Sequence, residues 1–124
     1  MALDSDRRRI AHLLRRATFG VSTAELENAV EAGYQATLER LLNPEGQADD
    51  VERLVPRDAF DLSQRPDCVR YWLLRMVHSK RQFLEKMTLF WHGHLTSSLA
   101  KTGNAPWLMV QQIDTYRSLA LGSF

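Results

Sequence analysis

Apolar residues recur at spacings of three and four along most of this 124-residue chain, and no stretch alternates apolar with polar residues as a strand does. The clearest example is the run of Val69, Trp72, Leu73, Met76 and Val77. At about 100° per residue, this spacing places the side chains on one side of an α-helix. The sequence therefore predicts an all-α fold, an irregular bundle of five or six helices with one long loop.

Capping residues divide the chain into these helices. The cluster Asp4-Ser5-Asp6 suits the start of the first helix, because acidic side chains there meet free backbone N–H groups. The residues from Ser22 to Glu25 form a capping box. Pro66 and Pro106 fit first turns, where the missing N–H costs nothing. We expect helices over residues 7–19, 23–32, 34–42, 66–78, 82–95 and 106–121.

Residues 43–65 contain Gly46, Pro56 and several acids, but few regularly spaced apolar residues. We interpret them as a long surface loop with one helical turn near Val51–Leu54. The predicted organisation is a single helical domain over residues 1–124, or the N-terminal fragment of a longer protein.

The apolar faces of the expected helices predict which residues form the core. Its expected members are Leu13, Leu14, Phe19, Leu38, Leu41, Trp72, Leu73, Met76, Leu84, Met87, Phe90, Trp91, Trp107 and Ile113.

The net charge of +1 conceals a separation of charge along the sequence. Residues 1–20 carry five arginines against two aspartates, residues 21–62 three arginines against ten acids, and residues 63–124 eight basic groups against three acids. In one interpretation, basic and acidic faces of one domain meet each other. In the other, the basic first helix binds an anionic partner through Arg8, Arg15 and Arg16. No nucleic-acid-binding motif accompanies these arginines, so we do not expect nucleic acid as the partner.

The sequence contains no candidate membrane span, since no window approaches the roughly 18 uninterrupted apolar residues that a span needs. No apolar run follows the basic residues near the N-terminus, as it would in a secretory signal. The default expectation is cytoplasmic residence, and export stays open because a leader can be absent from the sequence. Cys68, the single cysteine, cannot form an internal disulfide. Near a helix start and beside Arg65 and Arg70, it is a candidate for a lowered thiol pKa.

Four motifs appear in a defined order along the chain. They are HLLRRATFG at residues 12–20, WLLRM at 72–76, EKMTLFWHGHL at 85–95 and YRSLALGSF at 116–124. With these motifs the chain resembles the bacterial family called domain of unknown function 1800. The resemblance implies that members are several times longer than this chain, which would then be an N-terminal portion. The family has no assigned biochemical activity, so the resemblance does not imply a reaction for this chain.

A narrow polar stripe runs along the otherwise apolar helix expected at residues 82–95. On a helical wheel Glu85, Thr88, His92 and Thr96 fall within about 80° of one another. Such a stripe faces solvent or is satisfied internally, because an unpaired buried polar group costs about 1–3 kcal/mol.

The functional interpretation of the stripe is that Glu85 and His92 converge on a divalent metal or on a proton-transfer site. Carboxylate plus imidazole suits zinc or iron. His94 joins them only if Gly93 ends the helix, because residues i and i+2 point about 200° apart. Further ligands would then lie beyond residue 124. The structural interpretation pairs Glu85 with Arg81 and His92 with a backbone carbonyl.

Three hypotheses about function follow. The leading one is a helical region with a packing role and no assigned activity. Its partner is the remainder of its own longer chain or, in a homo-oligomer, a second copy. The first alternative is a metal-dependent hydrolase or oxidoreductase site that uses Glu85 and His92. The second is an anion-binding interaction module that uses the basic first helix.

Overall fold

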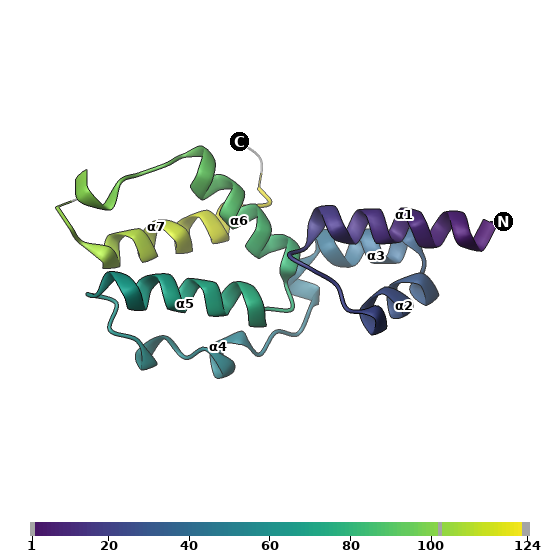
Figure 1. Ribbon diagram of the computed structural model, residues 1–124, viewed down its shortest axis with the longest axis horizontal. Coiled ribbons are helices and arrows are strands. Elements are labelled where there is room, and N and C mark those ends of the chain that lie inside the picture. Colours follow the sequence, from purple (N-terminus) through teal and green to yellow (C-terminus); the bar gives the residue numbers. More distant parts are fainter. Residues whose placement is uncertain (1, 102, 123–124) are drawn as a thin grey trace.

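In the computed structural model, the described residues 2–101 and 103–122 form helices and connections without any strand, so the all-α prediction is confirmed (Figure 1). Side chains are described from Ser5 onward. The α-helices are α1 (Ala2–Ala17), α2 (Thr23–Ala32), α3 (Tyr34–Leu42), α4 (Val51–Leu54), α5 (Arg65–His78), α6 (Gln82–His94) and α7 (Pro106–Leu119). Three short 3-10 helices are η1 (Pro44–Gly46), η2 (Arg57–Ala59) and η3 (Leu99–Lys101).

The expected number of five or six helices is slightly too low, because the described part of the chain contains seven α-helices. The additional one is the four-residue α4, which the sequence indicated only as a helical turn. The first helix also starts earlier than expected. It begins at Ala2, so the expected capping cluster lies within its first turns, and the Asp4 side chain lies outside the described residues.

The helices α1, α2 and α3 lie together at one end of the molecule (Figure 1). Their core is a cluster of Ile10, Leu14, Ala17, Ala29 and Leu41. The capping box that starts α2 is present as predicted. The Ser22 hydroxyl accepts from the Glu25 N–H at 3.2 Å, and the Glu25 carboxylate accepts from the Ser22 N–H at 2.7 Å.

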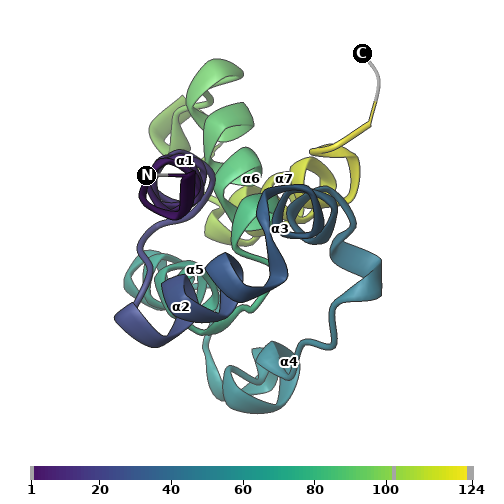
Figure 2. The same ribbon diagram turned by 90° about the vertical axis from the view of Figure 1, so that its right-hand side faces the viewer.

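A second core lies between α4, α5 and α7, at the other end of the molecule. It consists of Val51, Val55, Cys68, Tyr71 and Val110. Helix α6 connects the two ends, because it packs on α5 and α7 as well as on α1 and α3 (Figures 1 and 2). The side chains of α6 that face these four helices therefore determine how the two halves of the molecule pack together.

Residues 43–65 form more than the surface loop that the sequence indicated, because Val51 and Val55 are buried to 4% and 2% exposure. The same segment is fastened to the α5–α6 connection. The Asp49 carboxylate accepts from the Ser79 hydroxyl at 2.6 Å and from the Lys80 N–H at 3.2 Å. This segment thus closes one side of the second core.

Four of the expected core residues are exposed instead. Phe19, Leu73, Phe90 and Trp107 keep 43%, 52%, 53% and 49% of their surface accessible. On α6 the reason is orientation. The helix buries Glu85 and Thr88 and leaves Phe90 outward, the reverse of what apolar content alone predicts.

No helix in the described part of the chain is both long enough and apolar enough to cross a membrane.

We expect the substitution Ile10→Ala to lower the free energy of unfolding by about 2–5 kcal/mol, because it removes a fully buried side chain (0% exposed) and leaves a cavity. Leu42→Ala, at a position with 55% exposure, serves as the control and should change stability by less than about 1 kcal/mol. Urea unfolding followed by circular dichroism measures both. Equal losses for the two variants would contradict the placement of Ile10 in the core.

Candidate functional site

The polar stripe of α6 faces the interior of the protein. Glu85 and Thr88 keep only 1% and 0% of their surface exposed. The Thr88 hydroxyl donates to the Leu84 carbonyl at 2.8 Å, so its polar group is satisfied within the helix. A carboxylate in such a position needs a charged partner, because an isolated buried charge is too costly.

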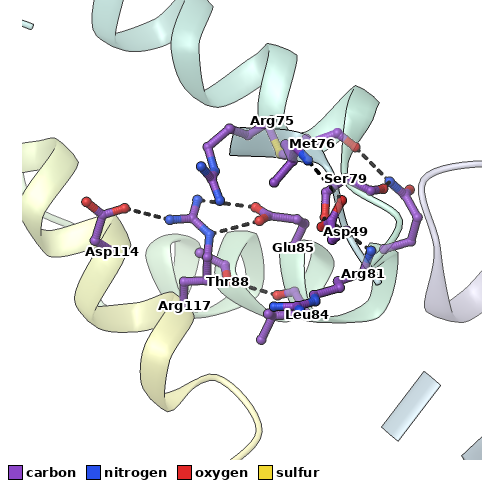
Figure 3. A network of polar contacts seen from close by, with 12 residues as sticks. Asp49, Arg75, Met76, Ser79, Arg81, Leu84, Glu85, Thr88, Asp114 and Arg117 are labelled. Carbon is purple, nitrogen blue, oxygen red and sulfur yellow. Dashed lines mark hydrogen bonds and ion pairs between the residues drawn. The ribbon is translucent and has the colours of Figure 1, made fainter. Parts of the chain in front are cut away.

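Arg117 on α7 is that partner. Its Nε donates to Glu85 Oε1 at 2.8 Å and its Nη2 to Glu85 Oε2 at 3.3 Å, a two-point contact that fixes the guanidinium plane. The two side chains are 13% and 2% exposed. Figure 3 shows Arg117 lying between Glu85 on one side and Asp114 on the other, and Arg117 Nη1 meets Asp114 Oδ1 at 2.6 Å.

The pair continues into a chain of charges. Asp114 also accepts from Arg57 Nη1 at 2.6 Å, and this contact holds the pKa of Arg57 above its usual value. Three elements, η2, α7 and α6, are thus connected by alternating charges. Glu85 is the buried end of this chain.

An open pocket of about 710 Å³ lies beside these residues, with walls from α3, α4, α5, α6 and α7. Arg57, Arg75, Arg81 and Arg117 line it, and so does Tyr71. Arg75 Nη1 donates to Glu52 Oε1 at 2.6 Å and to the Tyr71 hydroxyl at 3.2 Å. Burial works to lower the pKa of Arg75, but the contacts with Glu52 and Tyr71 outweigh it and raise this pKa.

His92 lies on the same side of α6 as Glu85, two turns further along the helix. Its ring meets Trp72 of α5 edge-on, with the ring centroids 4.9 Å apart. Burial lowers the pKa of His92, and its Nδ1 is buried without a hydrogen-bond partner among the described residues. The backbone carbonyl that the structural interpretation assigned to this histidine is thus not found at Nδ1.

The structure engages the three proposed metal ligands separately. Glu85 is held by Arg117, His92 packs on Trp72, and His94 stacks on Phe90 at 5.8 Å between ring centroids. Helix α6 continues through Gly93 and ends at His94. The helix end at Gly93 that would turn His94 towards Glu85 and His92 therefore does not occur. Among the described residues, no three His, Cys, Asp or Glu side chains are grouped so that they could hold a metal ion. Metal binding by Glu85, His92 and His94 stays a prediction.

Arg81 does not pair with Glu85 as the structural interpretation expected. It stands at the start of α6, where its Nε and Nη2 donate to the Gln47 carbonyl at 3.2 and 3.1 Å.

Arg117 and Arg75 are absent from the site residues expected from the sequence. The available signal was spacing, because Arg75 follows Tyr71 by four residues and Arg117 follows Ile113 by four. Each arginine therefore shares a helix side with an apolar residue, and arginine is rarely buried unless it is paired.

The basic first helix meets the acidic second helix. Arg7 donates through both of its Nη atoms to the two carboxylate oxygens of Glu27, each at 2.7 Å. The Arg9 guanidinium lies 4.8 Å from the centre of the Tyr34 ring. These contacts favour the interpretation in which basic and acidic faces of one domain meet. Anion binding by Arg8, Arg15 and Arg16, which are exposed on α1, stays a prediction.

The expectation of a lowered thiol pKa at Cys68 is wrong. Cys68 is buried, and its thiol donates to the Leu62 carbonyl at 3.2 Å. Burial raises its pKa, and the nearby carboxylates of Asp67 and Asp61 raise it further. A reactive thiolate is therefore not favoured at this position.

A family model described as "Protein of unknown function (DUF1800)" matches residues 12–124. No curated protein and no solved structure matches the chain.

We expect Arg117→Met to lower the free energy of unfolding by about 3–5 kcal/mol, because it leaves the Glu85 carboxylate buried without a partner. The matched control is Arg53→Met, which removes an exposed pair with Asp50 and should cost less than about 1 kcal/mol. Adding Glu85→Gln to Arg117→Met should restore part of the loss. Denaturant unfolding of the three variants tests this, and a loss in Arg117→Met no larger than in Arg53→Met would contradict it.

We expect His92 to make the fold less stable in mild acid. Its folded pKa is lowered from 6.5, so below about pH 6.5 the unfolded chain takes up a proton that the folded protein resists. Stability is therefore lost as the pH falls from about 6.5 towards the folded pKa. His92→Phe, which keeps a ring beside Trp72, should flatten the dependence of unfolding free energy on pH between about pH 7 and pH 5. His12→Phe, at an exposed position of α1, is the control, and equal slopes in both variants would refute the effect.

Proposed function

The chain belongs to the DUF1800 family, and we propose that it serves there as a packing module, which docks through an apolar face of α5 and α6 onto another part of a longer family protein. The observation that carries this proposal is a row of exposed apolar side chains on α5. Val69, Leu73 and Val77 are spaced four residues apart and keep 49%, 52% and 72% of their surface exposed.

This row extends onto neighbouring elements. Leu73 and Val77 line a groove of about 950 Å³ together with Leu89 of α6 and Phe19, the residue two positions after α1. Val69 and Leu73 line a second, shallower hollow of about 660 Å³. Because both hollows include Leu73, these five residues, Phe19, Val69, Leu73, Val77 and Leu89, form one continuous surface, which we call the apolar face.

Polar residues surround the groove. Glu25, Arg40, His78 and Lys80 lie among its lining residues. An apolar centre with a polar rim is the usual anatomy of a protein–protein interface. Contiguous exposed apolar surface is uncommon on monomeric proteins and marks sites of interaction.

The same helix uses its opposite side for the internal core. Tyr71 and Arg75 are buried at 3% and 7% exposure and each point about 160° away from Leu73 on a helical wheel. Helix α5 thus exposes apolar side chains on one side and packs Tyr71 and Arg75 of its other side into the core. This arrangement suits a helix that is sandwiched between its own domain and a partner.

We expect the isolated chain to bind a hydrophobic fluorescent dye and to associate as its concentration rises, because the apolar face is uncovered. The double substitution Leu73→Lys and Val77→Lys should remove most of the dye signal and yield a monomer, with the helical circular dichroism spectrum retained. Glu39→Lys, at an exposed position of α3, is the charge-matched control. A stable monomer that binds no dye would sink the proposal.

Light scattering during gel filtration separates the two kinds of partner. Association into mixed sizes that the lysine substitutions abolish supports an uncovered face that needs another segment. A single dimer of defined mass would instead assign the face to a second copy of this chain.

A further inference from the structure

We infer that the pocket bordered by Arg57, Arg75, Arg81 and Arg117 binds a small organic carboxylate with an apolar body. This pocket lies on the side of α5 opposite the apolar face, so the inference is independent of the packing role. The basis is the unequal way in which the arginines are occupied.

Arg117 is held by two carboxylates of the fold, and Arg57, whose side chain is 47% exposed, meets one through Nη1. Arg117 is held by Glu85 and Asp114, and Arg57 by Asp114. The other two arginines of the pocket differ. Arg81 meets a carbonyl oxygen, which carries no full charge, and Arg75 meets Glu52.

The pairing of Arg75 is incomplete. Its side chain is 8% exposed, and both of its hydrogen bonds to described residues use Nη1. Its Nε is buried and has no hydrogen-bond partner among the residues that the structure describes. A carboxylate frequently accepts from two nitrogens of one guanidinium, whereas Glu52 accepts from Nη1 of Arg75 alone. The guanidinium of Arg75 thus has hydrogen-bonding capacity that Glu52 does not use.

Glu52 is a weakly fixed occupant. Its side chain is 71% exposed, and one of its oxygens meets Arg75 at 2.6 Å. Because the Glu52 end of the pair is exposed, solvent screens much of its attraction to the buried Arg75. An entering carboxylate therefore displaces the Glu52 oxygen from Nη1 of Arg75 at small cost.

Tyr71 adds a neutral donor. Its hydroxyl oxygen accepts from Arg75, which leaves the hydroxyl proton available for a ligand oxygen. The ring is fixed by Phe60 at 5.3 Å between centroids. The donor is thus held in place before the ligand arrives.

The charges and apolar side chains that line the pocket indicate the chemical class of the ligand. Four arginines meet four acids, which are Glu45, Glu52 and Asp114 of the lining and Glu85, the partner of Arg117. Displacement of Glu52 therefore leaves an excess of one positive charge, which suits a monoanion. Leu42, Leu84 and Leu121 supply an apolar side. A pocket of about 710 Å³ has room for a small molecule rather than a lone ion. Together these features favour a monocarboxylic acid with an aliphatic or aromatic body.

The test is a titration of the whole chain followed by nitrogen–proton correlation spectra. The probes are benzoate and hexanoate, with benzamide and hexanamide as uncharged analogues and inorganic phosphate as the competing anion class. We expect saturable shifts for the two carboxylates at amides around the pocket, and none for the amides of the same shape. Equal binding of the amide analogues, or saturable binding of phosphate alone, would overturn the assignment.

Removal of the displaced group gives the sharper result. Glu52→Gln should tighten carboxylate binding roughly two- to fivefold, the range that corresponds to an exposed ion pair. Glu45→Gln removes the same charge from the same pocket without breaking an ion pair with Arg75, and should change the affinity less. An unchanged or weaker affinity in Glu52→Gln would contradict the displacement.

A loss-of-binding variant completes the set. Arg75→Met should abolish binding, and if that variant fails to fold, Arg81→Gln should weaken binding while the helical spectrum is retained. Full binding in a folded Arg75→Met or Arg81→Gln variant would overturn the proposal.

Discussion

The ion pair between Glu85 and Arg117 is the constraint on which the rest of the arrangement depends. A carboxylate with 1% exposure commits one side of α6 to the interior, because it is tolerable there only against a fixed cation. Arg117 supplies that cation from α7 and is itself fixed by Asp114. The consequence is that α6 turns polar atoms inward and leaves Leu89 and Phe90 outward.

This inversion explains why the protein has two different surfaces around α5. On the inner side, arginines and Tyr71 surround a pocket, while the outer side exposes valines and leucine in a row. Both surfaces require α6 to be oriented as it is, since α6 contributes Leu84 to the pocket and Leu89 to the apolar face. One buried pair thus fixes a candidate ligand site and a candidate docking face together.

The sequence predicted what local rules decide. The all-α class, the capping box at Ser22, and the bounds of α2 and α3 follow from spacing and capping. It failed where the outcome depends on distant partners. Helix α6 carries apolar residues on several sides, so periodicity does not say which side is buried, and Arg117 lies 32 positions from Glu85. The four-residue α4 is too short for any periodic signal, yet it brings Val51 into the core.

The most direct test of this account is a proton spectrum that resolves the arginine Nε–H groups of the intact chain near neutral pH. The account predicts a Nε–H resonance of Arg117 that exchanges slowly with water, shows contacts to protons of α6, and shifts when Glu85 is replaced by Gln. An Arg117 resonance averaged with those of exposed arginines, and indifferent to Glu85→Gln, would contradict the central role of the pair.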